Sequence, residues 1–414
     1  MTFEKLGINK DIVRALAEEG ITTPTMIQEK AIPTILEGKD LIGMSKTGSG
    51  KTAAFGVPIL QLIEQKQGVQ ILIMTPTREL AVQISNELTK FSKYMDAHIT
   101  TVFGGVAYGP QVEGMKRSEI IVGTPGRLLD HLQQGTLNLK GLKCLALDEA
   151  DKMVDMGFFE DINRIISYAP RERQVLLFGA TISSEVDRLK REQMKDPVIA
   201  KAESHVKDDF LEQYYYNTKS QEKFSLLVHL MKKENTDRVI VFCSTRSTVE
   251  ILSKNLGKQG IQVEMIHGKL SQNRRLRVIE DFNKGKHKVL VASAVAARGL
   301  HIENVSHVFN YDLSQDPEEY IHRVGRTARA GESGKAITLL TNRDHDTFNA
   351  ILSRFPITVE KMKMPTDFKK LRFEARSPSG RHGNRRSYSK SSYGGRSSHR
   401  NERTAWVNTS RFNK

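Results

Sequence analysis

The segment that decides the fold of this chain is Leu41-Ile42-Gly43-Met44-Ser45-Lys46-Thr47-Gly48-Ser49-Gly50-Lys51-Thr52. An apolar run leads into a loop of small residues, and a stretch that can open a helix follows. In this order of strand, loop and helix, backbone N–H groups converge on an anion, the Lys neutralises phosphate charge and the Thr hydroxyl can ligate Mg²⁺. The strict motif begins with Gly where this chain has Ser45. Taken alone, the segment also fits an ordinary Gly-rich turn.

A pair of acids strengthens the interpretation as a phosphate loop. Leu145-Ala146-Leu147-Asp148-Glu149-Ala150-Asp151 places an apolar run directly before two adjacent carboxylates, and Asp148 stands 97 positions after Lys51. Acids often follow strands, so the tetrapeptide is weak evidence by itself. Beside a phosphate loop it predicts that Asp148 holds Mg²⁺ and that Glu149 deprotonates the water that attacks the γ-phosphate.

Short apolar runs alternate with longer amphipathic runs through most of the chain, which predicts parallel, doubly wound α/β sheets with a ligand at the carboxyl ends of the strands. The expected strands of the first half are 41–44, 70–75, 99–103, 119–123, 144–147 and 175–178, with a helix at 79–94 as an example between them. The pattern repeats in strands 237–242, 262–266, 288–292, 307–311 and 335–340, without a second phosphate loop. We therefore expect two similar domains, residues 1–205 and 206–372, joined near 196–209.

Composition points to a polyanionic partner. The 414 residues carry a formal net charge of +15, with 38% hydrophobic residues, enough for packed cores. Cys144 and Cys243 lie in apolar runs and are expected to be buried thiols of a reducing compartment. No signal peptide and no apolar run of membrane-spanning length is found, which favours a cytoplasmic protein without membrane contact.

The composition changes at residues 373–414. From Glu374 to Lys414 the chain has eight Arg and two Lys against two Glu, with nine Ser and four Gly. Such a segment cannot bury enough apolar surface to offset chain entropy, and we expect it to be disordered. Aromatic residues spaced among the basic ones suit single-strand binding by charge and stacking, namely Tyr388, Tyr393, Trp406 and Phe412. A solubilising tail without a partner is the alternative.

Over residues 3–345 the chain resembles the DEAD-box ATP-dependent RNA helicases of superfamily 2. Asp148-Glu149-Ala150-Asp151 matches the motif that names this family, and the segment from Gly20 to Gln28 resembles its adenine-reading Q motif. The other matching segments follow in the family's order: Pro76-Thr77-Arg78-Glu79-Leu80-Ala81, Gly104-Gly105, Thr124-Pro125-Gly126-Arg127, Gly179-Ala180-Thr181, His267-Gly268 with Gln272 and Arg275, and the segment from His322 to Arg329.

The resemblance implies two tandem RecA-like domains that bind ATP and Mg²⁺ and hydrolyse ATP when RNA is bound, with domain closure and local unwinding of short duplexes. The implied catalytic residues are Glu149, Asp148, Lys51, Arg326 and Arg329, with Thr52 and Asp148 on the metal. The implied nucleotide contacts are Phe3, Gln28, Ser45, Lys46, Thr47, Gly48, Ser49, Gly50, Lys51, Thr52, Asp148 and His301. The implied RNA contacts are Pro76, Thr77, Arg78, Gly104, Gly105, Thr124, Pro125, Gly126, Arg127, Gly268, Gln272, Arg275 and Ser293, and residues that couple the domains are Asp151, Thr181 and His322.

Weak sequence preference for RNA and a monomeric state are expected. Two other functions stay open: a DNA-directed translocase of the same superfamily, and a nearly inactive RNA clamp or chaperone that depends on the basic tail. The second gains weight because the chain departs from the family's motifs at Gly179, Ala294, His301 and Ala328. RNA-stimulated ATP turnover separates these alternatives.

His301 generates a first prediction. The family has Asp at this position, where it accepts a hydrogen bond from the ATP ribose, whereas a protonated His cannot accept one. A charged acceptor contributes about 1.5–3 kcal/mol and a neutral one about 1 kcal/mol. We expect His301→Asp to lower the RNA-stimulated KM for ATP several-fold and to reduce its pH dependence between about 6 and 8, the range in which His titrates. Steady-state kinetics at several pH values check this, and an unchanged KM would show that position 301 does not meet the ribose.

Overall fold

The computed structural model describes residues 1–45, 49–201, 211–234, 236–293, 302, 305–327 and 333–375. Met1–Ala375 forms one compact unit. The predicted basic tail beyond Ala375 lies outside the described residues.

The first half of the chain forms a seven-stranded sheet with the order β3-β4-β2-β5-β6-β1-β7, in which every pair of neighbours is parallel. Its strands are β1 (Leu41–Met44), β2 (Ile71–Met74), β3 (Ile99–Val102), β4 (Ile120–Gly123), β5 (Cys144–Leu147), β6 (Gln174–Gly179) and β7 (Val198–Lys201). Six of these were expected from their apolar runs. The seventh, β7, lies inside the predicted joining stretch 196–209, and it was missed because its edge position leaves Val198 and Ile199 exposed.

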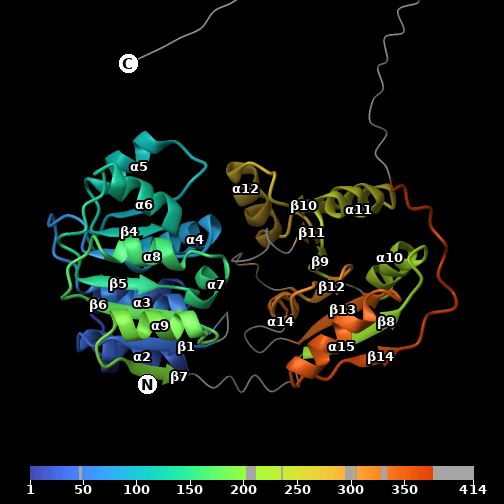
Figure 1. Cartoon of the computed structure of the whole chain (residues 1–414), viewed down its shortest axis with the longest axis horizontal. Coiled ribbons are helices and arrows are strands. Elements are labelled where there is room, and N and C mark those ends of the chain that lie inside the picture. The colour runs from blue at the N-terminus through green and yellow to red at the C-terminus, as the bar shows by residue number, and fades with distance from the viewer. Residues whose placement is uncertain are drawn as a thin grey trace, which may run out of the picture. The chain divides into compact units, whose positions relative to one another are not determined.

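Helices cover both faces of this sheet because successive strand residues point to opposite sides. Ile71 and Ile73 of β2 pack in one core cluster, and Leu72 and Met74 pack in another. Helices η1 (Glu4–Leu6), α1 (Lys10–Glu18), α2 (Met26–Leu36), α3 (Lys51–Leu60) and α4 (Arg78–Phe91) contribute to the first cluster. The second cluster receives α5 (Tyr108–Met115), α6 (Pro125–Gln133), α7 (Ala150–Asp155), α8 (Phe159–Ile166) and α9 (Ser184–Gln193) (Figure 1).

The second half repeats the same topology. Its seven-stranded sheet has the order β10-β11-β9-β12-β13-β8-β14, again with parallel neighbours. The strands are β8 (Leu211–Asn217), β9 (Val239–Cys243), β10 (Val263–Ile266), β11 (Val289–Ser293), β12 (His307–Asn310), β13 (Gly334–Leu340) and β14 (Glu360–Met362). The prediction of two similar doubly wound domains is confirmed. Strands β8 and β14 were missed because neither is a continuous apolar run.

Helices flank this second sheet in the same manner. Helices α10 (Lys223–Lys233) and α11 (Arg246–Lys258) pack on one face, against Val239, Val241 and Cys243. On the other face, Ile240 and Phe242 meet α12 (Gln272–Asn283), α14 (Pro317–Val324) and α15 (His345–Arg354). Both cysteines are buried and unbridged, as expected. No helix in the described ranges is long and apolar enough to cross a membrane.

The last described segment is tied to α10 and α11. The rings of Phe373 and Phe224 lie 5.2 Å apart between centroids, and Leu371 donates its N–H to the Ser225 hydroxyl at 2.9 Å. Asn255 accepts from the backbone N–H of Glu374 at 3.0 Å and donates to its carbonyl at 3.2 Å. Phe373 and Glu374 therefore contact residues of α10 and α11.

We expect Phe373→Ala to destabilise the second domain by about 1–3 kcal/mol, since it removes a half-buried aromatic side chain from the core edge. The matched control is Arg372→Ala, which truncates the exposed neighbouring side chain. Urea unfolding of the full chain checks the difference. Equal stability of the two variants would show that the Phe373 ring contributes nothing to the fold.

Candidate functional site

The site lies at the carboxyl ends of β1, β5 and β6, where parallel strands deliver their following loops to one sheet edge. The phosphate loop follows β1 and the acids follow β5. Strand β6 lies between them and ends at Gly179, whose carbonyl accepts the backbone N–H of Ser45 at 3.2 Å. The sheet order thus brings together segments about a hundred residues apart in the sequence.

Lys51 is the first residue of α3 and is buried, with its ammonium directed back onto the phosphate loop. Its Nζ donates to the Ser45 carbonyl oxygen at 2.9 Å, and the hydroxyls of Ser49 and Ser45 are 2.7 Å apart. A buried ammonium needs such acceptors. The Lys51 ammonium is therefore held on the Ser45 carbonyl, at the start of the predicted phosphate loop. The predicted contacts Lys46, Thr47 and Gly48 lie outside the described residues.

Gln28 joins the Q-motif segment to the phosphate loop. Its side-chain carbonyl accepts the Thr25 N–H at 2.8 Å, and its amide donates to the Gly50 carbonyl at 3.0 Å. The Thr25 hydroxyl donates to the Ser49 carbonyl at 2.9 Å. Gly50 has φ of +85°, and a Cβ there would stand 2.4 Å from the Gln28 amide nitrogen. Only glycine suits this position, for both conformation and space.

Phe3, a predicted adenine contact, packs in the apolar core and is 1% exposed. Its ring is covered by neighbouring side chains, so an adenine could stack on it only after the N-terminal segment moves. Its role in nucleotide binding stays a prediction from the sequence.

Asp148 and Glu149 are both buried. Burial raises the pKa of Asp148 to about 6, opposed chiefly by the Lys51 ammonium, and the Glu149 N–H donates to the Asp148 carboxylate at 2.9 Å. When burial raises the pKa of a carboxyl group in this way, a cation bound nearby stabilises its charged form. Within the described ranges no cluster of three or more His, Cys, Asp or Glu could hold a metal alone. The buried Asp148 carboxylate is a ligand of the kind that suits Mg²⁺, which commonly takes one or two carboxylates together with substrate phosphates.

Glu149 occupies a strained backbone position, with φ of +55° and ψ of +46°, as the N-cap of α7. One carboxylate oxygen, Oε1, accepts from the Lys152 ammonium at 2.5 Å. The other, Oε2, is buried and finds no hydrogen-bond partner in the part of the chain that the structure describes. Burial favours the neutral acid, yet the charges of Lys152 and Lys51 hold the pKa of Glu149 below its usual value. Lys152 was missed by sequence reasoning, although its spacing of three from Glu149 suits a helical ion pair.

Asp151 ties α7 to the end of β6. Its Oδ2 accepts from the backbone N–H groups of Ala180 and Thr181 at 2.8 and 2.9 Å, and from the Thr181 hydroxyl at 3.2 Å. A Cβ at Gly179 would lie 3.3 Å from the Asp151 carboxylate, closer than most such contacts. The acid segment and the Gly-Ala-Thr segment are therefore held as one piece.

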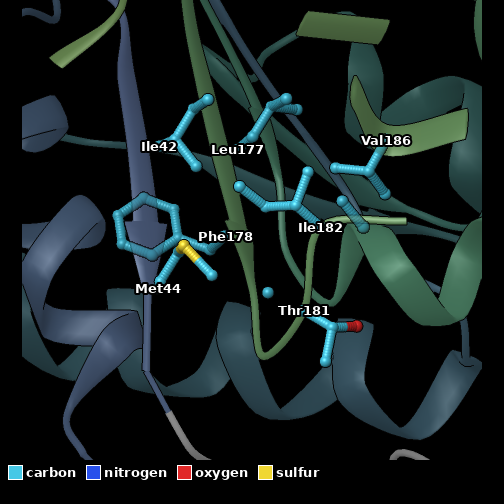
Figure 2. A pocket seen from close by; sticks show the side chains of 9 residues that line it. Ile42, Met44, Leu177, Phe178, Thr181, Ile182 and Val186 are labelled. Atoms are coloured by element: carbon cyan, nitrogen blue, oxygen red, sulfur yellow. The ribbon is translucent and has the colours of Figure 1, made fainter. Parts of the chain in front are cut away.

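An apolar pocket lies next to this link, between β1, β6 and the loop that enters α9. Figure 2 shows Ile42, Leu177 and Ile182 among the side chains around it. Thr181 is the single polar residue in its lining. This lining offers no charge for a phosphate, so the pocket is not the nucleotide site.

A second group of predicted residues gathers at the ends of β2, β3 and β4. Arg78 opens α4, and a Cβ at Gly105 would stand 2.3 Å from its guanidinium. Gly104 lies between this guanidinium and that of Arg127 on α6, at 3.4 and 3.9 Å from a built Cβ. Thr77 and Thr124 are the N-caps of these two helices, and Pro76 and Pro125 adjoin them. Helix N-termini with nearby arginines suit a phosphate backbone.

Tyr108 also lies in this group of residues, although the sequence alone did not indicate it. The Arg127 guanidinium lies 5.5 Å from the centre of the Tyr108 ring, and the same ring stacks on His131 with 4.0 Å between the ring centroids. The aromatic stack restrains Arg127, whose charge is thereby kept beside Gly104.

Residues of the second domain meet this group through Glu79. The Gln272 amide and the Arg275 guanidinium both reach the same carboxylate oxygen of Glu79, at 2.9 Å each. Glu79 is buried, although a charged residue in the first turn of a helix is usually exposed to solvent. Of the other predicted RNA contacts, Gly268 has open space at its Cβ position, and Ser293 is buried at the end of β11.

The arginine-bearing segment follows α14. Burial lowers the pKa of His322 to about 4, reinforced by the charges of Lys152 and Arg326, so His322 is neutral at physiological pH. Arg326 is buried, and the Glu149 carboxylate opposes the effect of burial on its pKa. Arg329, Ala328, Ala294 and His301 lie outside the described residues.

Comparison with known proteins agrees with this geometry. The DEAD/DEAH box helicase family profile matches residues 25–189, and the helicase conserved C-terminal domain profile matches residues 222–331. The chain is 42% identical over 368 residues to the DEAD-box ATP-dependent RNA helicase CshA of Geobacillus kaustophilus, covering 88% of this chain and 79% of that protein. It is 43% identical to the ATP-dependent RNA helicase CshA of Listeria monocytogenes, at 88% and 71% coverage.

Solved structures give the same result. Dbp5 of S. cerevisiae bound to RNA and ADP BeF3 superposes with a TM-score of 0.79 at 30% identity, covering 87% of this chain and 95% of that one. A DEAD box protein from Methanococcus jannaschii is 37% identical, with a TM-score of 0.54 and coverage of 88% and 99%.

The contact between Gln28 and Gly50 generates a prediction. Gly50→Ala places a Cβ 2.4 Å from the Gln28 amide in a backbone conformation unfavourable to alanine, so we expect ATP affinity to fall about tenfold or more. Gly109→Ala is the matched control, because a Cβ there meets open space and its backbone needs no positive φ. Titration with a fluorescent ATP analogue checks both variants. Equal affinities would show that the geometry at Gly50 is not needed for nucleotide binding.

Proposed function

Since this chain belongs to the DEAD-box family of ATP-dependent RNA helicases, we propose that it hydrolyses ATP at the carboxyl edge of its first sheet and that RNA binding controls this reaction. The observation that carries the proposal is the convergence of Lys51, Asp148 and Glu149 on one buried site, from segments far apart in sequence. A lysine and two carboxylates brought together in this way are typical of sites for phosphoryl transfer, where positioning and electrostatics supply most of the catalysis.

Each group has a distinct proposed role. The Lys51 ammonium leaves the Ser45 carbonyl and contacts the β- and γ-phosphates, and the Gln28 amide faces the adenine edge. Thr52 and Asp148 hold Mg²⁺, which neutralises phosphate charge when it is bound. Glu149 orients a water and accepts its proton as the water attacks the γ-phosphate. Arg326 and Arg329 contact the γ-phosphate from the second domain, and such arginines accelerate phosphoryl transfer by about 10³–10⁵.

We infer that RNA lies along the group formed by Arg78, Gly104, Gly105 and Arg127. These contacts address the sugar–phosphate backbone, which predicts weak sequence preference. Among the structural relatives, Dbp5 was solved with RNA and ADP BeF3 bound, which supports an arrangement that holds both ligands at once. ATP and RNA together favour closure of the two domains, and loss of the γ-phosphate contacts after hydrolysis releases them.

Asp151 and Thr181 connect the two activities in this proposal. Their hydrogen bonds fix the end of β6 to the helix that begins beside Glu149, and His322 belongs to the segment that carries the arginines. A movement of the segment that carries the arginines would therefore change the position of Glu149, the proposed base. The monomeric state and the cytoplasmic location expected from the sequence stay predictions.

The proposal predicts that Glu149→Gln binds ATP and RNA with nearly unchanged affinity but turns over at least about 100-fold more slowly, since the metal ligand is kept and the base is removed. Lys51→Ala is expected to lose turnover together with nucleotide affinity, because phosphate charge is no longer neutralised. RNA-stimulated phosphate release and equilibrium binding, measured side by side, check both. If Glu149→Gln lost ATP binding instead, its assignment as the base would be wrong.

The same assay separates the alternatives. An RNA-directed enzyme is stimulated by single-stranded RNA and little by DNA of the same sequence, whereas a DNA translocase shows the reverse. A non-catalytic clamp binds RNA without stimulated turnover. The family relationship favours the first outcome.

A further inference from the structure

Lys152 is a buried cation that the family's mechanism leaves without a task. Its side chain is 8% exposed, as is that of Glu149, and the two groups meet at 2.5 Å. Lys152 lies in the first turn of α7, three positions after Glu149, so the helix directs its ammonium back toward the base. Within the part of the chain that the structure describes, Glu149 is the one carboxylate paired with this ammonium.

The pairing divides the Glu149 carboxylate into two unequal oxygens. Oε1 accepts from Lys152, whereas Oε2 is buried and has no hydrogen-bond partner among the described residues. A buried acceptor without a partner is unfavourable, so the site favours a ligand that donates to it. An attacking water is such a donor. The bond to Lys152 therefore leaves one defined oxygen for the water and fixes the torsion angles of the carboxylate.

Stability alone does not account for this ion pair. A buried pair of opposite charges often stabilises a protein no more than apolar side chains of similar volume in the same place. The nearby Lys51 ammonium does not orient the Glu149 carboxylate, since it donates to the Ser45 carbonyl. Asp148 accepts from the Glu149 backbone N–H and leaves that side chain unrestrained. Lys152 thus binds the Glu149 carboxylate directly and restrains where it points, and the charge of Arg326 also acts on this carboxylate.

We propose that Lys152 is a positioning residue for ATP hydrolysis, which holds Oε1 of Glu149 so that Oε2 receives the proton of the attacking water. The inference rests on the proposed role of Glu149 as the base. The ammonium keeps its own proton throughout, and the water's proton passes to Oε2 as its oxygen bonds to the γ-phosphorus and the bond to the β-phosphate oxygen breaks.

The test compares four full-length variants. Lys152→Gln removes the charge, and Lys152→Arg restores a cation that can still donate to Oε1. Lys116→Gln is the matched control, because Lys116 also pairs with a Glu three positions away, but on the surface. We expect Lys152→Gln to lower RNA-stimulated kcat roughly tenfold or more, with KM for ATP and RNA affinity changed by less than about twofold. Lys152→Arg is expected to recover most of kcat, and Lys116→Gln to equal the wild type.

The fourth variant combines Lys152→Gln with Glu149→Gln. If Lys152 acts through Glu149, the double variant turns over no more slowly than Glu149→Gln alone. Additive losses, or an unchanged or raised kcat for Lys152→Gln, would overturn the proposal. Should Lys152→Gln fail to fold, Lys152→Met, which keeps the apolar stem without the charge, decides in its place by the same criteria. A Glu149→Gln variant that retained wild-type turnover would instead refute the role of the base itself.

Discussion

The constraint on which this structure depends is the burial of charge at one edge of the first sheet. Lys51, Asp148, Glu149 and Lys152 all lie largely out of contact with water. Groups of this kind are tolerated only where each finds a counter-charge or a hydrogen-bond partner. The partners are a loop carbonyl, a backbone N–H and each other, and one carboxylate oxygen has none. Such a site is prepared for a charged ligand that completes it.

The two halves share one topology but divide the chemistry. Strands β1 and β8 occupy equivalent places in their sheets. The glycine-bearing phosphate loop follows β1, whereas Thr218-Lys219-Ser220-Gln221 follows β8 and has no glycine for the same cradle. The second domain instead supplies Arg326 from the segment after α14. Because the proposed base and this arginine stand on different domains, we infer that hydrolysis depends on the arrangement of both, which would let a bound RNA control it.

Local sequence predicted most of the fold and the identity of the central site residues. The run before Ser45 and the run before Asp148 are continuous and apolar, and their sheet neighbours follow from the topology of parallel sheets. Two of the edge strands, β7 and β14, escaped prediction because they have little to bury, and β8 escaped it because it is not a continuous apolar run. The contacts of Lys152 and Glu79 also escaped it. A charged residue in a helix is normally exposed to solvent, and only the tertiary structure shows that Lys152 and Glu79 are buried.

The central claim is that the Lys51 ammonium exchanges the Ser45 carbonyl for nucleotide phosphate at the edge that carries Asp148 and Glu149. A crystal structure of the full chain with Mg²⁺ and a non-hydrolysable ATP analogue tests this directly. The account predicts Lys51 Nζ on the β- and γ-phosphates, the metal beside Asp148, and a water within hydrogen-bond distance of Glu149 Oε2. A nucleotide bound elsewhere, with Lys51 still on the Ser45 carbonyl, would contradict it.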